Sequence, residues 1–346
     1  MIPVAARTSS QSTPGRLRAT LRRSVKQLAK IDIFNGDADG ICALHQLRLA
    51  APGSDRLVTG VKRDIGLLER VDALPGDEVT VLDLSLEPNR RGLMRLLDAG
   101  AHVRYFDHHY AGEVPVHPNL QAHIDTAADV CTSILVDRHL DGRFRPWAVA
   151  AAFGDNLVQS AEALAHAGGY ARARTRMLAA LGECLNYNGY GDSLADLHFH
   201  PAELYAALRP FADPGEFVAV SPVYAELTTG FRADMRKTKT LAPAIDDPAC
   251  RAYVLPDAPW ARRVSGVFAN RLAAELPGAA HSVLTPDAHG SYTVSVRAPV
   301  AKPCGADTLC RAFENGGGRK AAAGINRLPA AAVDEFLRRF AEHCFG

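Results

Sequence analysis

Acidic and histidine side chains recur in three short motifs near the start of this chain. Each motif comes where an apolar run ends, and the three are Asp37-Ala38-Asp39-Gly40, Val81-Leu82-Asp83 and Asp107-His108-His109. Carboxylates and neutral imidazole groups suit hard or borderline divalent ions such as Mn²⁺ or Mg²⁺, whereas a structural zinc site would favour cysteine thiolates. The residue types therefore predict a site for divalent metal ions.

A fourth carboxylate, Asp155, follows the apolar run 148–153 and is placed to complete that site. Together the motifs offer enough ligands for two ions. A carboxylate that bridges two ions about 3.5–4 Å apart makes a clamp that activates water and stabilises the leaving oxygen in phosphoester cleavage. Phosphoester chemistry is therefore the reaction class that this ligand set favours.

Ligands so far apart in the chain can converge if they follow parallel strands. Three runs have the composition of strands: 31–34, 78–84 and 101–106. Between the last two, Pro88 near the start of a stretch and Gly100 just past its end are typical of the two ends of a helix. A strand, a helix and a strand within about thirty residues form a parallel βαβ unit. Open α/β sheets bind ligands outside the carboxyl ends of their strands, so we expect Asp83 and His108 at the same edge.

These residues resemble the DHH phosphoesterase superfamily, which is named for the triplet that stands here at 107–109. Two C-terminal runs are similar to the DHH-associated substrate-binding domain: Ser295-Val296-Arg297 and Gly316-Gly317-Gly318-Arg319-Lys320-Ala321-Ala322-Ala323-Gly324. The resemblance covers roughly residues 30–160 and 250–346. It implies an α/β fold with an N-terminal doubly wound, mainly parallel sheet that has helices on both faces, plus a smaller C-terminal α/β domain with a mixed sheet.

The resemblance also implies a role for each matching residue. Two Mn²⁺ or Mg²⁺ ions would be held, with Asp83 as the bridge, by Asp37, Asp39, Asp83, His108 and Asp155. Asp107 would orient a histidine through a hydrogen bond, and His109 would point toward the scissile phosphate. A phosphate or base would be gripped by Arg297, Gly316, Gly317, Gly318, Arg319 and Lys320. Glycines let backbone N–H groups come close to a ligand, and arginine can bind phosphate through two hydrogen bonds.

The chain departs from the family pattern at two positions. Many relatives carry a histidine two residues before the first motif aspartate, where Asn35 stands here. Its amide oxygen can still coordinate a metal, though more weakly, so Asn35 is kept among the candidate ligands. The glycine-rich loop usually ends in histidine, whereas Arg319 keeps a donor and a fixed charge but cannot transfer a proton. The first departure concerns metal affinity and ion preference, and the second concerns substrate preference.

The implied function is metal-dependent hydrolysis of phosphoester bonds in short oligonucleotides or nucleotides. NanoRNA-degrading enzymes, phosphatases of 3′-phosphoadenosine 5′-phosphate and single-strand exonucleases all match this description. The first motif, 37–40, looks closer to the exonuclease and archaeal branch than to the nanoRNA-degrading branch. Two alternatives stay open: a non-catalytic nucleotide or nucleic-acid binder on the same fold, and a pyrophosphatase or polyphosphatase.

The pattern along the chain predicts four segments. They are a basic disordered arm over 1–29, a metal-binding catalytic domain with a helical insertion over 30–211, a connector over 212–247 and a substrate-binding domain over 248–346. An organellar transit peptide would have the same composition as the arm. Turn-forming residues mark 186–192, and the connector is long enough to let the two domains close over a substrate.

Composition fits a cytoplasmic enzyme with two cores. The chain has 346 residues, 47% of them hydrophobic, and 39 basic against 38 acidic side chains give a net charge of +1. Recognition of a polyanion would therefore depend on a local patch. Seven cysteines, an odd number without a Cys-x-x-Cys pair, indicate reduced thiols. No apolar stretch is long enough to predict a membrane span, and the oligomeric state stays open, with a homodimer among the arrangements considered.

Two other clusters are better explained without chemistry. His198-Phe199-His200 has the spacing of a metal site but no clustered acidic partners, so packing roles are favoured. The basic run Arg236-Lys237-Thr238-Lys239 is typical of a solvated helix face.

Overall fold

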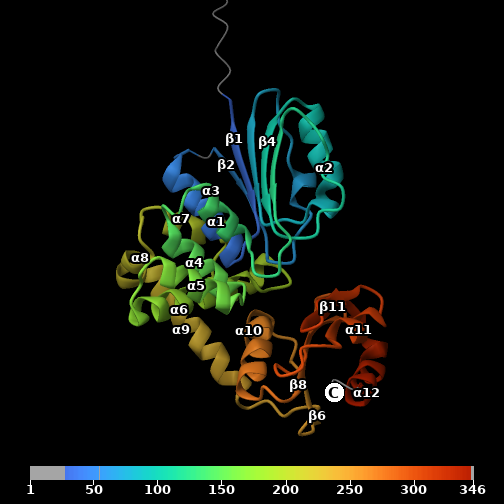
Figure 1. The fold of residues 1–346 in the computed structure, drawn as a ribbon. Helices are drawn as coiled ribbons and strands as arrows, with labels where there is room; N and C mark the ends of the chain where they lie inside the picture. Colours follow the sequence, from blue (N-terminus) through green and yellow to red (C-terminus); the bar gives the residue numbers. More distant parts are fainter. Residues whose placement is uncertain (1–27, 54, 344–346) are drawn as a thin grey trace, which may run out of the picture.

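The structure is a computed structural model that describes residues 28–53 and 55–343, so the predicted basic arm lies almost entirely outside the described residues. Figure 1 shows a parallel sheet at the top, a central group of helices and a second sheet at the lower right. The α/β class predicted from the sequence is confirmed. Among the described residues, no helix combines the length and the apolar character needed to traverse a lipid bilayer.

The first sheet consists of five parallel strands. In chain order these are β1 (Lys30–Phe34), β2 (Arg56–Val58), β3 (Glu78–Leu82), β4 (His102–Asp107) and β5 (Leu120–Ile124). Their order in space is β2-β1-β3-β4-β5. The chain leaves β1 toward β2 on one side and leaves β3 toward β4 on the other side, so the crevice that such sheets use for ligands lies at the carboxyl ends of β1 and β3.

Both faces of this sheet are apolar and covered. Ile31 and Ile33 pack into one core with helix α2 (Leu86–Asp98) and the short helix η1 (Leu67–Arg70). Phe34, which points to the opposite face, packs into a second core with the central helices. Successive side chains of a strand alternate between faces, and buried parallel strands need apolar residues on both. The doubly wound arrangement expected for the N-terminal sheet is therefore present.

The central group consists of helices that follow β1 and β5. Their bounds are α1 (Ala38–Ala50), α3 (Thr132–His139), α4 (Arg145–Gly154), α5 (Val158–Ala167), α6 (Arg172–Gly189), η2 (Leu194–Asp196), α7 (Pro201–Leu208), α8 (Pro214–Val220) and α9 (Pro222–Thr238). The segment predicted as a connector, 212–247, thus contains two helices. Apolar side chains of α9, including Leu227 and Phe231, belong to the same core as Phe34, so this segment is packed against the body of the protein.

Two glycines let three of these helices lie unusually close together. A Cβ atom added to Gly182 on α6 would lie 1.9 Å from the carbonyl oxygen of Ala150 on α4. One added to Gly154 at the end of α4 would lie 2.5 Å from the Cβ of Ala38 on α1. Only residues without a Cβ fit here. This close packing brings the end of α4, and with it Asp155, next to the start of α1.

The prediction of a turn over 186–192 is partly wrong, because α6 continues to Gly189. Asn188 is buried, and its side chain exchanges hydrogen bonds with the backbone of Phe199, at 2.9 Å and 3.1 Å. Asparagine and glycine favour turns when local preferences decide. Here the backbone of Phe199 supplies the hydrogen bonds that the Asn188 side chain would otherwise form in a turn, so tertiary contacts override the local preference.

The second sheet has six strands and is mixed, as expected. It contains β6 (Ile245–Asp246), β7 (Cys250–Val254), β8 (Ala280–Pro286), β9 (Ser291–Arg297), β10 (Gly316–Gly318) and β11 (Ala322–Pro329), in the spatial order β10-β11-β9-β8-β7-β6. Only β7 and β8 pair in parallel. Helix α10 (Pro259–Glu275) joins this sheet to the central helices, while the other face is covered by α11 (Ala306–Arg311), η3 (Ala330–Ala332) and α12 (Val333–Glu342).

Buried ion pairs fix α10 against the central helices. Arg262 donates two hydrogen bonds to Asp196, at 3.0 Å and 2.9 Å, and Arg263 donates to Asp234 on α9 at 2.7 Å. His198, from the cluster that the sequence assigned to packing, shares this network through a 2.7 Å hydrogen bond with Tyr187. Breaking such a pair by removing one partner leaves a buried charge, which costs about 3–5 kcal/mol. The second sheet is therefore held at a defined position.

His45 on α1 is a buried histidine whose neutral form stabilises the fold. Its Nε2 donates to the carbonyl oxygen of Phe211 at 2.8 Å, and its ring lies edge-on against Trp147. Burial lowers the pKa of His45 from 6.5 to about 4. Above pH 6.5 neither the folded nor the unfolded state takes up this proton, so the contribution of His45 to stability is fully present there. It is lost as the pH falls toward 4.

We expect His45→Gln to flatten this part of the pH dependence of stability. The glutamine amide can still donate a hydrogen bond to Phe211, but it does not titrate. Between pH 6.5 and pH 4, the wild type should lose roughly 3 kcal/mol more free energy of unfolding than the variant. Urea unfolding at several pH values measures the difference, with the exposed His102→Gln as control. Equal losses in the wild type and His45→Gln would contradict the assignment.

Candidate metal centre

The carboxylates of the first motif lie at the turn between β1 and α1, where backbone N–H groups hold them. Asp37 is the N-cap of α1, and its Oδ1 accepts hydrogen bonds from the backbone of Asp39 and Gly40, at 3.0 Å and 3.1 Å. The carboxylate of Asp39 accepts from the backbone N–H groups of Thr132 and Ser133, both at 2.7 Å. These donors belong to the start of α3. Helix N-termini therefore fix both carboxylates and favour their ionised form.

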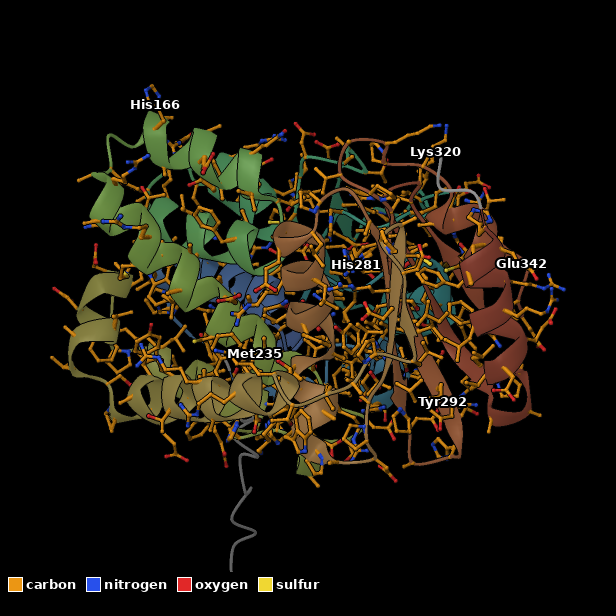
Figure 2. The ribbon with its side chains drawn as sticks, turned by 90° about the horizontal axis from the view of Figure 1, so that it is seen from below. His166, Met235, His281, Tyr292, Lys320 and Glu342 are labelled. Atoms are coloured by element: carbon orange, nitrogen blue, oxygen red, sulfur yellow. The ribbon has the colours of Figure 1, made fainter. Side chains whose placement is uncertain are left out.

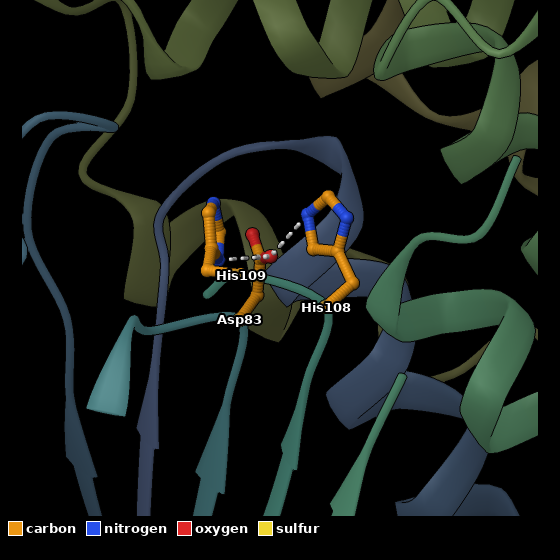
Figure 3. Close-up of side chains that lie close together, drawn as sticks. All are labelled: Asp83, His108 and His109. Atoms are coloured by element: carbon orange, nitrogen blue, oxygen red, sulfur yellow. Dashed lines mark ion pairs between the residues drawn. The ribbon is translucent and has the colours of Figure 1, made fainter. Parts of the chain in front are cut away.

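Asp83 follows β3 with a left-handed backbone, at a φ of 59°. Aspartate tolerates this conformation better than most residues, and such strain is often found at functional sites. The side chain is 2% exposed, and its Oδ1 accepts a hydrogen bond from the Thr132 hydroxyl at 3.1 Å. Figure 3 shows Asp83 between the rings of His108 and His109, which come from the end of β4. The nearest imidazole nitrogen, Nε2 of His108, lies 3.4 Å from Asp83 Oδ1.

The two histidines of the triplet are held in different ways. Nδ1 of His108 lies 2.9 Å from the carbonyl oxygen of Val130. A carbonyl can only accept, so Nδ1 carries the proton and Nε2 faces the carboxylates, the arrangement found in metal-ligating histidines. Nδ1 of His109 instead lies 2.7 Å from Oδ1 of Asp107. The histidine that Asp107 orients is therefore His109.

Ligand atoms converge in two groups among the described residues, and within each group they all lie within 4.8 Å of one another: Asp39 with His108 and Asp155, and Asp83 with His108 and His109. In the second group the nitrogen of His109 nearest to Asp83 is the one that Asp107 already engages. His109 therefore lies beside the other candidate ligands with its Nδ1 already engaged by Asp107. The structure thus brings together four of the predicted ligands, Asp39, Asp83, His108 and Asp155.

The charges of this centre are not balanced by the protein alone. Burial raises the pKa of Asp83 well above its ordinary value, and the charges of Asp39 and Asp37 raise it further. Burial also raises the pKa of Asp39. For His108, burial lowers the pKa, but the hydrogen bond and charge of Asp83 overcome this and raise it to about 10. A group of buried carboxylates that draws a proton onto a neighbouring imidazole fits a divalent cation, because the cation satisfies the same field.

Asp37 and Asn35 lie outside the two groups of converging ligand atoms, and both contact a lysine that sequence reasoning missed. The ammonium of Lys62 donates to Oδ2 of Asp37 and, at 3.2 Å, to Oδ1 of Asp155. Burial opposes the charge on both Asp37 and Lys62, yet their attraction lowers the pKa of Asp37 and raises that of Lys62 well above its ordinary value. Asn35 donates its amide to the backbone oxygen of Lys62 at 3.2 Å, and its own Oδ1 is buried without a partner among the described residues.

A signal for Lys62 exists in the sequence, but it is weak. The residue comes shortly after β2, a three-residue strand that has no strong strand pattern. Because β2 is parallel to β1, its carboxyl end points to the same edge as the acidic motifs. Recognising β2 would have placed Lys62 near the centre.

A cleft of about 1040 Å³ separates the first sheet from the second and meets the metal centre at Lys62, which belongs to both. The cleft is lined by Val61, Lys62, Arg63, Asp64, Ile65, Arg70, Tyr190, Gly191, Asp192, Ser193, Leu194, Asp287, His289, Thr293, Ser295, Asn315, Asn326 and Arg327. Its acidic residues have partners: Asp64 pairs with Arg70, Asp192 accepts from the backbone of Ala288, and Asp287 caps its own turn. Arg63 and Arg327 have no carboxylate partner among the described residues and could contact an anionic ligand, although Asp192 and Asp287 keep their negative charge.

The residues predicted to grip the substrate lie near this cleft but not in its lining. Arg297 continues the face of β9 that carries Thr293 and Ser295, yet its Nε donates to Asn270 at 2.9 Å. Arg319 donates to the carbonyl oxygen of Ala128 at 3.2 Å, and Lys320 is exposed at the periphery of the molecule (Figure 2). Their part in substrate binding stays a prediction.

The glycine-rich loop expected at 316–318 is a strand instead. Gly316, Gly317 and Gly318 form β10 and pair with β11, and the turn of this hairpin follows at 319–322. A Cβ on Gly318 would lie 2.5 Å from the backbone of Ala323, so close pairing of the two strands accounts for this glycine. A Cβ on Gly316 would lie 1.8 Å from the carbonyl oxygen of Cys310, so Gly316 and Gly318 have a structural role that local sequence could not reveal.

The fold is similar to that of solved DHH-type structures. No family profile matches the chain, and no curated protein matches it either. Exonuclease RecJ bound to manganese is 20% identical, with a TM-score of 0.56 over 90% of this chain and 89% of the other. A DHH domain described as belonging to a family of ribosomal proteins is 14% identical, with a TM-score of 0.60 over 91% and 86% of the two chains. A pGpG-specific phosphodiesterase from Vibrio cholerae is 16% identical, with a TM-score of 0.52 over 90% and 96%.

These neighbours define the class of the fold. The chain has the fold of DHH phosphoesterases over both of its sheets, and the resemblance first seen in the motifs is confirmed at the level of the fold. The candidate metal centre lies at the sheet edge where the motifs predicted it.

We expect Asp83→Asn to weaken Mn²⁺ binding and to stabilise the metal-free protein. The amide can still accept a hydrogen bond from Thr132, but it removes one buried negative charge. Mn²⁺ affinity should fall at least about 100-fold, since even partners behind the ligands contribute 10–100-fold. The metal-free variant should melt roughly 2 °C or more above the metal-free wild type.

Isothermal titration with Mn²⁺ and thermal unfolding in a chelator measure the two effects. Asp98→Asn, at the exposed end of α2, is the control and should change neither. Unchanged Mn²⁺ affinity in Asp83→Asn would remove Asp83 from the metal centre.

Proposed function

We propose that this protein is a metal-dependent phosphoesterase that hydrolyses phosphoester bonds in short oligonucleotides or nucleotides. The observation that carries the proposal is the direct contact between two features: a buried group of side chains that could hold a metal ion, and a cleft that carries Arg63 and Arg327 and meets this group at Lys62. Phosphate diesters need both, a centre that supports hydrolysis and cations that hold the negatively charged substrate beside it. The fold neighbours, an exonuclease and a pGpG-specific phosphodiesterase, support the same reaction class.

Asp39, Asp83, His108 and Asp155 would hold the metal, for which Mn²⁺ or Mg²⁺ suits the oxygen and imidazole donors. When bound, a divalent ion would lower the pKa of water and stabilise charge on a phosphoryl oxygen. His109 lies beside these ligands, and Asp107 fixes its Nδ1, which leaves Nε2 for the substrate. Burial lowers the pKa of His109, but the hydrogen bond to Asp107 and the charge of Asp83 raise it overall, which favours the protonated ring. We infer that Nε2 of the protonated ring donates a hydrogen bond to a phosphoryl or leaving oxygen, while buried Asp107 keeps the ring in that orientation.

The N-terminal part of the chain would thus carry the chemistry, and the C-terminal sheet would present the substrate. The two parts share the cleft: Arg63 comes from the first and bonds Thr293 of the second, and Arg327 stands on β11. A volume of about 1040 Å³ is at the upper end of small-molecule sites, which hold ligands in about 300–1,000 Å³. It suits one or two nucleotides better than a long duplex. A short substrate is therefore favoured.

The substrate class is tested with purified protein, Mn²⁺ and a panel of phosphate esters. The panel contains dinucleotides, longer single strands, a cyclic dinucleotide, 3′-phosphoadenosine 5′-phosphate and pyrophosphate. We expect turnover of dinucleotides or single strands, its loss in chelator, and a 10²–10⁴-fold lower kcat for His109→Gln with unchanged Mn²⁺ binding. His166→Gln, at an exposed position of α5, is the control.

Two results would overturn the proposal. Tight binding of a panel nucleotide without turnover at any Mn²⁺ concentration would favour a non-catalytic binder. Turnover restricted to pyrophosphate would favour a pyrophosphatase.

Substitutions of Arg327 and Arg319 distinguish between two substrate-binding positions, the cleft and the hairpin turn. Within the described part of the chain, Arg327 lines the cleft and has no hydrogen bond or ion pair, whereas Arg319 contacts Ala128 outside the lining. We expect Arg327→Gln to raise KM roughly fivefold with little change in kcat, and to weaken the salt dependence of KM. Arg319→Gln should leave KM within about twofold. The reverse order would place the substrate at the hairpin turn, as the family resemblance implied.

A further inference from the structure

The ammonium group of Lys62 lies inside the candidate metal centre. It donates hydrogen bonds to Asp37 Oδ2, to Asp155 Oδ1 at 3.2 Å and to Asn186 Oδ1 at 3.3 Å. Two of these three acceptors, Asp37 and Asp155, are among the ligands that the sequence predicts for a pair of metal ions. A positive charge supplied by the protein therefore occupies part of the space where a second metal ion is expected.

The backbone of Lys62 is anchored, so the lysine is not a mobile surface side chain. Its N–H donates to the carbonyl oxygen of Gly189 at 2.8 Å, and its own carbonyl oxygen accepts from Asn35 at 3.2 Å. The ammonium also lies 5.6 Å from the ring centre of Tyr190, a cation–π distance. The side chain is only 23% exposed. These contacts hold the Lys62 side chain in an orientation that points into the candidate metal centre.

Asp37 is fully engaged without a metal ion. Its Oδ1 accepts from the backbone of Asp39 and Gly40 at the start of α1, and its Oδ2 accepts from Lys62. In the described residues, neither of the two groups of converging ligand atoms includes Asp37. The two carboxylate oxygens of Asp155 have different neighbours: Oδ1 contacts Lys62, while Oδ2 lies 3.9 Å from His108 Nε2. One half of the centre is therefore compensated by Lys62, whereas among the described residues no lysine or arginine pairs with Asp39 or Asp83.

We propose that Lys62 supplies one of the two cations of this centre, so that the protein binds a single divalent ion through Asp39, Asp83, His108 and Asp155. This inference rests on the proposed metal-dependent function and changes the expectation of two ions per site. Asn35 fits the same arrangement, since it stands where relatives carry a stronger histidine ligand and instead contacts the lysine backbone. The position that would ligate a second ion has become a support for Lys62.

Charge adds an argument against a second ion beside the lysine. The carboxylates of Asp37, Asp39, Asp83 and Asp155 carry four negative charges, whereas Lys62 with one divalent ion supplies three positive charges and Lys62 with two would supply five. A second divalent ion would have to displace the ammonium from Asp37 or lie beside it, and a displaced lysine would leave a buried site for a less favourable one. We expect any second Mn²⁺ to bind at least about 100-fold more weakly than the first, a difference of about two tenfold steps in affinity.

The test counts metal ions. Equilibrium dialysis against Mn²⁺ followed by elemental analysis should give one ion per wild-type chain. Lys62→Met keeps the length of the side chain and removes its charge, so it should bind two ions, with the magnetic coupling of an ion pair in the electron paramagnetic resonance spectrum. Lys237→Met is the matched control, because Lys237 also pairs with a buried aspartate, Asp234, at 2.9 Å on α9. Its count should stay at one.

Lys62→Arg, which keeps the charge, should also bind one ion and provides a second variant should the methionine variant unfold without metal. A wild-type count of two ions with similar affinities overturns the inference, and so does a count of one in folded Lys62→Met. Either result leaves the proposed phosphoester hydrolysis intact, because turnover is measured separately on the substrate panel. A wild type that binds no Mn²⁺ overturns the inference and the proposed function together.

Discussion

Buried carboxylates crowd together at the carboxyl edge of a parallel sheet, and the surrounding structure is arranged to hold them there. Asp37 and Asp39 are fixed by the N-termini of α1 and α3, and Asp83 is fixed by a left-handed backbone and the Thr132 hydroxyl. Ionised groups removed from water are costly unless opposite charge compensates them. Lys62 compensates part of this charge, while burial and the charges of Asp39 and Asp37 raise the pKa of Asp83 well above its ordinary value. The edge is therefore a candidate site for a cation.

The same edge faces the second sheet across a cleft whose position is set by rigid contacts. Helix α10 shares a core with the central helices and is tied to them by the pairs of Arg262 and Arg263. The segment predicted as a connector is helical and packed, so the cleft has a defined width in this structure. Substrate specificity would then depend on the few side chains that reach across it, above all Arg63 and Arg327. Neither arginine forms an ion pair among the described residues, although Arg63 donates a hydrogen bond to Thr293.

Elements with strong local sequence patterns are the ones whose position in the fold could be predicted. The strands that carry Asp83 and His108 have strong apolar patterns, and a βαβ unit leaves little freedom in how they pair, so their convergence could be predicted. Elements with weak patterns were missed, among them the three-residue β2 and the two-residue β6. The glycines at 316–318 were expected in a loop because glycine favours turns, but close pairing with β11 makes them a strand. Asn188 extends α6 because Phe199 supplies its hydrogen bonds.

By itself the sequence determined the class of fold and the edge of the sheet where the carboxylates gather. These follow from residue type and from periodicity, which act over short distances along the chain. Only the tertiary structure decided which histidine Asp107 holds, that Arg297 turns toward Asn270, and that Lys62 enters the centre from a neighbouring strand. Such contacts join residues far apart in the chain, and the choice among several acceptable partners is made by packing rather than by local preference.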